Sequence, residues 1–176
     1  MKNLHQHKAV LDSPELYQME GRQADVLMFF EEILRNGIDF RVKVTGRSMA
    51  PFLSGGETLT IGQGASGSLR RGDLVLFRDR YDRPVIHRIL RIKKTYDGAF
   101  RFLTKGDALT AFDEEIHGEN VLGKVLLIER PLPSGKTRHI DMTSPFYRGM
   151  NLLIALLDFF RTHTFYFLSG VAARRI

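Results

Sequence analysis

Six short segments bounded by turn-forming residues constrain the fold of this 176-residue chain most strongly. The first, Phe40 to Thr45, alternates strictly between apolar and polar side chains, as a half-buried strand does. The others lie at residues 58–61, 73–77, 85–92, 100–103 and 121–129. Glycine, proline and aspartate fill the connections, as in Asp97-Gly98. The pattern predicts a mainly β protein built on a coiled antiparallel sheet.

Helical patterns flank the predicted β-domain. Apolar residues recur at helical spacing from Gln23 to Asn36, and they do so again from Met150 to Phe160. Ser13-Pro14-Glu15 is typical of a further helix start. We therefore divide the chain into an N-terminal tail with an amphipathic helix (1–39), a β-domain (40–130) and a helical C-terminal extension (131–176).

Two interpretations of the C-terminal extension stay open. Its helix packs on the β-domain or serves a protein–protein surface, or it lies on a membrane with Arg174-Arg175 at the headgroups. Periodicity cannot separate these cases, because both need the same apolar stripe. Charged residues interrupt the longest apolar stretch, Leu152 to Val171, so we predict no transmembrane helix.

Composition excludes several classes of function. The net charge is +6, but basic residues occur in no run longer than a pair, so we predict no nucleic-acid partner. The charge fits a membrane surface or an acidic partner equally well. Cysteine is absent, which rules out disulfides and a thiolate nucleophile, and we expect neither a metal nor an organic cofactor. Residues 1–10 are too polar for a signal peptide, so we expect a cytoplasmic protein, with peripheral membrane contact through residues 131–176.

A constrained serine follows the first predicted strand, within Gly46-Arg47-Ser48-Met49-Ala50-Pro51. Gly46 permits backbone angles that a side chain would forbid, and Pro51 fixes its own φ and pushes Ala50 towards an extended conformation. The main chain then aims the hydroxyl of Ser48, as a nucleophile requires. Ordinary turns also contain these residues, so the hexapeptide alone does not decide between the two readings.

A serine hydroxyl needs an adjacent base to act as a nucleophile. His87 lies inside a predicted strand on the face of Val85 and Ile89, whereas the other five histidines lie in the tail, in a loop or in the C-terminal extension. An imidazole ordinarily titrates near pH 6.5 and is the natural base at neutral pH, although a strand histidine can also be structural. Asp107 or Asp113, in the loop after the next strand, could orient it, unless that loop is simply a solvated acidic surface.

Four motifs in order resemble the signal peptidase I family, in the archaeal and endoplasmic-reticulum type that uses histidine where the common bacterial type uses lysine. They are Gly46 to Pro51, Arg71 to Phe77, Pro84 to Leu90 and Phe102 to Asp107, within a region from Phe40 to Ile128. The resemblance implies a serine endopeptidase that forms an acyl-enzyme on a peptide or protein precursor. An extended substrate would lie alongside a strand, with small side chains in shallow pockets.

The resemblance also implies roles for individual residues. Ser48 would be the nucleophile, His87 the general base and Asp113 the orienting acid, with Asp107 a supporting or alternative acid. Lys105 is a weaker candidate base, because its motif has a structural role in the family. The backbone N–H of Ser48 would help to hold the oxyanion. We expect the oxyanion and the substrate to be bound at Gly46, Met49 and Pro51.

The chain departs from the family in several places. The amphipathic helix stands where the family has a membrane-spanning anchor, so we expect a soluble form without that anchor. Ala108-Leu109 replaces an Asn-Asn pair, and Phe112-Asp113 replaces paired acids. Gly46 stands where the bacterial type has a serine that assists the oxyanion hole, which leaves main-chain donors for that task.

Two other functions are open at this point. One is a self-cleaving regulator of the SOS-repressor type, which shares the nucleophile motif but uses lysine where His87 stands, with Ala172-Ala173 as the candidate cleavage site. The other is a non-catalytic peptide-binding module on the same fold. A Ser48 hydroxyl more than about 5 Å from the His87 ring would favour the binding module, because base and nucleophile must come within hydrogen-bond reach.

Overall fold

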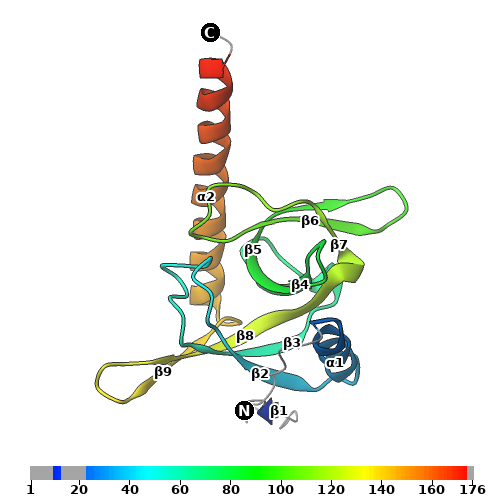
Figure 1. Cartoon of the computed structure of the whole chain (residues 1–176), viewed down its shortest axis with the longest axis vertical. Coiled ribbons are helices and arrows are strands. Elements are labelled where there is room, and N and C mark those ends of the chain that lie inside the picture. The colour runs from blue at the N-terminus through cyan, green and yellow to red at the C-terminus, as the bar shows by residue number, and fades with distance from the viewer. Residues whose placement is uncertain (1–9, 13–22, 174–176) are drawn as a thin grey trace.

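The computed structural model describes residues 10–12 and 23–173, with side chains described from Asp25 to Thr164 (Figure 1). The expected helix start at Ser13-Pro14-Glu15 lies outside the described residues. The elements are β1 (Val10–Asp12), α1 (Gln23–Arg35), β2 (Asp39–Lys43), β3 (Thr58–Gln63), η2 (Ser66–Ser68), β4 (Leu74–Arg78), β5 (Pro84–Lys94), β6 (Phe100–Lys105), β7 (Ile116–His117), η3 (Gly118–Asn120), β8 (Val121–Pro131), β9 (Thr137–Asp141) and α2 (Pro145–Ala173).

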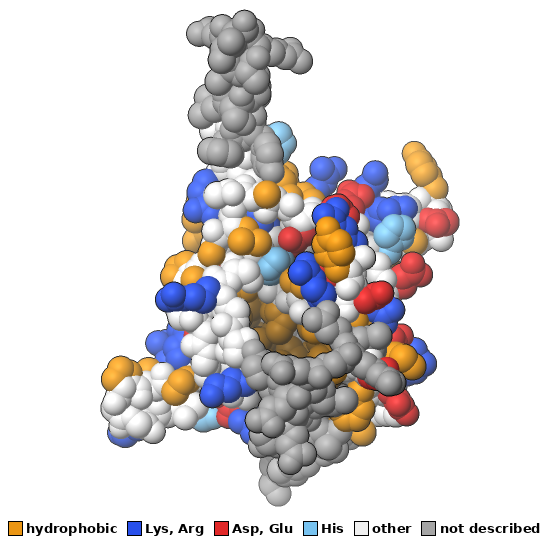
Figure 2. Space-filling view, viewed as in Figure 1, with side chains coloured by type: hydrophobic (Ala, Val, Ile, Leu, Met, Phe, Trp, Pro, Cys, Tyr) orange, Lys and Arg blue, Asp and Glu red, His pale blue; other side chains and the backbone are white. Residues whose placement is uncertain are grey.

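The described strands form one sheet in the order β1-β2-β3-β8-β4-β5-β6-β7, with β9 paired to β8. Only the β1–β2 pair is parallel, so the predicted mainly antiparallel fold is confirmed. Three register shifts, at Thr60/Ile61, Leu76/Phe77 and Ile89/Arg91, interrupt the ladders. Such bulges bend strands and increase their twist, and β4 to β7 curl away from β2 and β3 in Figure 1. Figure 2, in the same view as Figure 1, shows a hollow lined by hydrophobic side chains.

All six predicted strands are present, and β1, β7 and β9 are additional. The sequence gives little sign of these three, because β1 and β7 have three and two residues. In β9 only Ile140 is buried. This strand forms because a tight turn with Gly135 at φ 77° folds it back on β8. It pairs with residues Leu127–Pro131 of β8, beyond the stretch of β8 with which β4 pairs.

Two hydrophobic clusters lie on either side of the central strands. The first joins α1 to β2, β3 and β8, and Phe30 of α1 stacks on Phe40 of β2 with ring centroids 4.4 Å apart. The second lies between β4, β5 and β6 and includes Phe77, Ile89 and Phe102. Each strand between them has two buried faces to fill, which explains the nearly continuous apolar run of β4.

The long helix α2 begins at Pro145, where a first-turn proline has no N–H left unsatisfied, and Ser144 caps it by accepting from the Tyr147 N–H. Its first half packs against β5, and its second half extends beyond the sheet in Figure 1. Among the described residues, no helix is both long and apolar enough to cross a membrane.

The packing of α2 requires a glycine at position 72. Gly72 has φ 94°, and a Cβ added there would lie 2.7 Å from the carbonyl carbon of Asn151 in α2. We expect Gly72→Ala to lower the free energy of unfolding by roughly 2–5 kcal/mol, because backbone strain of about 1–2 and overpacking of about 1–3 kcal/mol add. Gly98→Ala is the control, since Gly98 has φ 85° but open space around it. Urea denaturation measures both variants, and an equal loss in the two would contradict the proposed contact.

Candidate active site

The loop between β2 and β3 leaves Ser48 half-buried, while its neighbours Met49 and Leu53 are anchored in the first hydrophobic cluster. Met49 is 3% exposed and Leu53 is fully buried. The Leu53 N–H donates to the Met49 carbonyl at 2.8 Å, and the Ala50 N–H donates to the Arg47 carbonyl at 3.0 Å. Of the expected substrate-binding residues, Met49 therefore lies in the core, whereas Pro51 is exposed. A serine between two such anchors has little conformational freedom.

The expectation that Gly46 is needed for its backbone angles is not met. Its φ lies outside the left-handed region, and a Cβ added there would meet nothing within 4 Å. The glycines that adopt positive φ in this loop are Gly55 and Gly56, at 95° and 92°. They form the turn that returns the chain to β3, and the Gly56 N–H donates to the Val44 carbonyl at 2.7 Å. Gly46 instead leaves open space beside the serine.

Glu57 lies at the end of the same loop, directly before β3. It is 2% exposed and accepts from the N–H groups of Ser54 and Gly55 at 3.0 and 2.9 Å, and Arg130 lies 3.3 Å away. Burial alone would raise the pKa of this carboxyl, but these backbone hydrogen bonds and the charge of Arg130 together hold it below the ordinary value. The ionised form of Glu57 therefore stabilises the loop that carries Ser48.

The structure brings Ser48, His87 and Asp113 into one chain of hydrogen bonds. His87 Nε2 lies 3.1 Å from Ser48 Oγ, and His87 Nδ1 lies 2.7 Å from Asp113 Oδ2. The same carboxylate oxygen accepts from the Thr104 hydroxyl at 2.8 Å. The His87 side chain is 7% exposed and that of Asp113 is 22% exposed. Ser48 and His87 are thus well within the 5 Å limit beyond which a binding module would be favoured.

This geometry defines what the imidazole can do. An ionised carboxylate only accepts, so Nδ1 of His87 donates to Asp113, and Nε2 is left as the acceptor that faces the Ser48 hydroxyl. A hydroxyl, an imidazole and a carboxylate in this order form the arrangement of serine hydrolases. Within the described part of the chain, no group of three or more histidine, aspartate or glutamate side chains could hold a metal ion.

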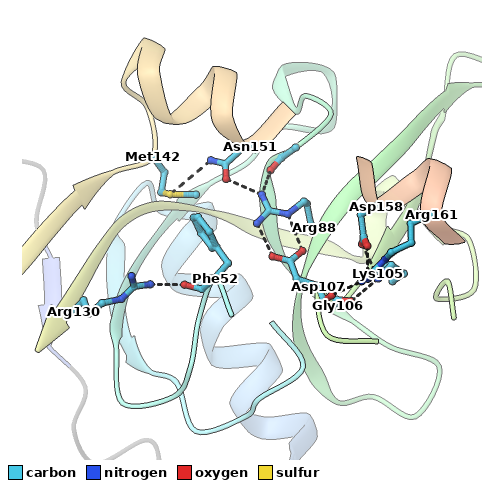
Figure 3. A network of polar contacts seen from close by, with 11 residues as sticks. Phe52, Arg88, Lys105, Gly106, Asp107, Arg130, Met142, Asn151, Asp158 and Arg161 are labelled. Atoms are coloured by element: carbon cyan, nitrogen blue, oxygen red, sulfur yellow. Dashed lines mark hydrogen bonds and ion pairs between the residues drawn. The ribbon is translucent and has the colours of Figure 1, made fainter. Parts of the chain in front are cut away.

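Asp107, the other candidate acid, is paired with Arg88 instead. Arg88 is completely buried and donates to both carboxylate oxygens at 2.8 and 2.7 Å. It also donates to Asn151 Oδ1 of α2 at 2.7 Å and lies over the Phe52 ring (Figure 3). Because Arg88 follows His87 directly in β5, this network fixes the strand that carries the imidazole.

Lys105, the alternative base, is likewise bound to buried partners. Its ammonium is fully buried, pairs with Asp158 of α2 at 2.6 Å and donates to the Gly106 and Leu109 carbonyls (Figure 3). These bonds hold the turn that lies against the serine. A Cβ on Gly106 would come within 2.6 Å of the Ser48 carbonyl oxygen and 3.0 Å of His87 Nε2. Lys105 thus ties this turn to α2.

Sequence reasoning missed Thr104, Asn151 and Asp158. Nothing in the motif from Phe102 to Asp107 singles out Thr104 from its neighbours. The two α2 residues share a face with Ala155 and Thr162 at a spacing of three and four, and all four are buried. Two sequence features signal this packing. One is the stripe of small and polar residues in a helix rich in leucine and phenylalanine, and the other is the presence of charged residues in otherwise apolar strands.

The comparisons with known proteins relate this chain to signal peptidases. No protein-family model matches it. It is 30% identical over 92 residues to the "Signal peptidase complex catalytic subunit SEC11C" of Homo sapiens, of Mus musculus and of Canis lupus familiaris. The aligned region is 51% of this chain, and the chain spans about half, 48%, of the length of each relative.

The low pKa of Glu57 makes a pH-dependent contribution to stability. A carboxyl whose pKa is lowered by folding stabilises the fold above its unfolded pKa and loses that effect as the pH falls through its folded pKa. We expect Glu57→Gln to cost roughly 1.5–3 kcal/mol at pH 7, and less as the pH falls below the ordinary value of 4.5. Urea titrations at pH 7 and pH 3 measure this.

The control for Glu57 is Glu114→Gln, which removes an ion pair with Arg80 whose Glu114 side chain is 67% exposed. Such a pair contributes at most about 1 kcal/mol. A Glu57→Gln effect of the same size at both pH values would contradict the assigned role of the carboxylate.

The buried pair of Lys105 and Asp158 gives a double-mutant test. Lys105→Met or Asp158→Leu alone leaves a buried charge with fewer partners, and we expect each to cost roughly 3 kcal/mol. The double variant removes both charges, so its cost is expected to be well below the sum. Chemical denaturation of the four proteins gives the coupling energy, and strictly additive costs would contradict a direct interaction.

Proposed function

We propose that the chain is a serine endopeptidase that cleaves a peptide or protein precursor through an acyl-enzyme. The observation that carries the proposal is the series of hydrogen bonds from Ser48 through His87 to Asp113, at 3.1 and 2.7 Å. A nucleophile within reach of a base, with the base oriented by a third group, is the requirement for activating a hydroxyl.

In the acylation step, Ser48 Oγ would attack the carbonyl carbon of the scissile peptide bond. His87 Nε2 would take the hydroxyl proton, and the Asp113 carboxylate would stabilise the imidazolium that forms. The backbone N–H of Ser48 would donate to the oxyanion, with the open space beside Gly46 left for the substrate backbone. The imidazolium would then give its proton to the leaving amine as the C–N bond breaks.

In the deacylation step, the same groups would act on water. His87 Nε2 would accept a proton from a water molecule whose oxygen attacks the ester carbonyl. When the tetrahedral intermediate collapses, the proton returns to Ser48 Oγ, and the product leaves as a carboxylic acid. Asp107, Arg88 and Lys105 would take no part in proton transfer, because buried partners already engage them.

The relatives support a peptide substrate. Their names describe the catalytic subunit of a signal peptidase complex, and the region they share with this chain is half of its length. We infer by extension that the substrate is a precursor whose extended segment lies beside a strand near Ser48. The same proposal places the protein's action in the cytoplasm or at a membrane surface, which α2 would contact.

The proposal is tested by cleavage of a proteome-derived peptide library, with new termini counted by mass spectrometry. We expect Ser48→Ala and His87→Ala to lower the rate by at least about 10³-fold, because such residues act as one unit. Asp113→Asn is expected to cost roughly 10²–10⁴-fold through the wrong imidazole tautomer. Ser68→Ala and His139→Ala, which alter exposed residues, are matched controls that retain full activity.

Equal turnover by wild type, Ser48→Ala and His87→Ala would overturn the catalytic proposal. Absence of cleavage by a folded wild-type protein that still binds peptides would favour the non-catalytic module. Self-cleavage is read from the same samples by intact mass after long incubation. Ala172-Ala173 lies in the last turn of α2, and an unclipped chain would overturn processing at that site.

A further inference from the structure

The long helix α2 packs against the domain with its polar side. Its buried residues are Asn151, Ala155, Asp158 and Thr162, none more than 8% exposed. Several of its large apolar residues are exposed instead, among them Phe146 at 71%, Leu153 at 56%, Leu157 at 62% and Phe160 at 63%. Figure 2 shows hydrophobic and basic side chains together over this helix. Apolar surface of this kind on a helix marks an interaction site.

One flank of this apolar surface forms the wall of a groove of about 650 Å³. The groove runs between α2 and the end of the β8–β9 hairpin. Its volume lies within the range of about 300–1,000 Å³ that is typical of binding clefts. Its apolar lining includes Phe146, Met150, Ile154 and Leu157 of α2 and Ile140 of β9. Leu153 and Phe160, on the outer side of the helix, do not line it.

The groove adjoins the loop that carries Ser48. Pro51 and Phe52, three and four residues after Ser48, form part of its wall. Asp107 also lines it, and Asp107 follows Gly106, whose turn lies against Ser48 and His87. A chain that lies in the groove therefore ends beside the nucleophile loop.

The charge of the groove is basic. Three arginines line it: Arg138, Arg161 and Arg130, of which Arg130 is already paired with Glu57 at 3.3 Å. The two carboxylates in its wall are already compensated from behind, Asp107 by Arg88 at 2.7 Å and Asp158 by Lys105 at 2.6 Å. The guanidinium of Arg161 is 66% exposed although it contacts Asp158. An occupant therefore meets an apolar floor with positive charge at its edges.

We propose that this groove binds an apolar segment of the precursor that carries carboxylates along its edges, and holds it while the adjoining residues reach Ser48. This inference rests on the proposed function and names its substrate class as acidic, amphipathic peptides. Burial of leucine-sized side chains would supply the affinity, and the arginines would select the charge.

Two other occupants fit the observations less well. A bilayer meets the outward residues Leu153 and Phe160 but, being flat, does not fill a groove between a helix and a hairpin. In a second copy of the chain, the helices would bring like charges together. Outside the buried face, the ionisable side chains described along α2 are Tyr147, Arg148, Arg161 and His163, and none is acidic. An acidic peptide matches both the shape and the charge.

The test uses the Ser48→Ala protein, which keeps the groove and removes the nucleophile. The probe is a fluorescein-labelled 18-residue peptide of leucine, alanine and glutamate, with leucines at helical spacing; its counterpart has lysine in place of glutamate. Anisotropy titrations are expected to show at least about tenfold tighter binding of the acidic peptide. Leu157→Glu is expected to weaken that binding at least about tenfold, and the matched control Leu153→Glu less than about twofold.

Several outcomes would overturn the proposal. These are equal affinity for the two peptides, no binding of the acidic peptide, or the same loss in both leucine variants. Two more assign the surface to another occupant: a wild-type dimer that Leu157→Glu dissociates, or binding to phosphatidylglycerol vesicles that both leucine variants abolish. Library cleavage without acidic-peptide binding overturns the groove alone. Acidic-peptide binding without library cleavage overturns the proposed endopeptidase alone.

Discussion

Two buried cations, Arg88 and Lys105, connect the sheet to the long helix, and the candidate site depends on them. Arg88 and Lys105 are completely buried, and a charge in that position is tolerated only when it is paired and hydrogen-bonded. Their partners come from the turn after β6 and from α2. Since Arg88 follows His87 and Lys105 precedes Gly106, the residues that satisfy these charges also fix the imidazole and the turn beside the serine.

The fold class and the positions of the long strands could be predicted from the sequence, because their signals are local. Alternation in residues 40–45 and turns such as Asp97-Gly98 report the backbone directly. The proximity of Ser48 and His87 required more than periodicity. It was expected from the order of four motifs that resemble a known family, and the structure now gives the contact a distance of 3.1 Å.

Other features escaped prediction because they arise only from packing. β9 carries one buried residue and forms because β8 offers it an open edge. Asp107 and Asp113 could not be separated by sequence, since both lie in the same acidic loop; the fold directs Asp107 to Arg88 and Asp113 to His87. Gly46 was expected to be required for its backbone angles, yet the positive φ angles of that loop lie at Gly55 and Gly56.

The nucleophile loop and the imidazole are rooted in different parts of the interior. Met49 and Leu53 fix the loop in the cluster around α1, whereas His87 packs edge-on to Phe77 of the cluster between β4 and β6. The distance between the Ser48 oxygen and the His87 nitrogen therefore depends on how these two clusters are held relative to each other. The helix α2 contacts β5, which carries His87, and Asn151 of α2 donates to Met142 of the first cluster, so α2 joins the two regions between which the proposed proton transfer occurs.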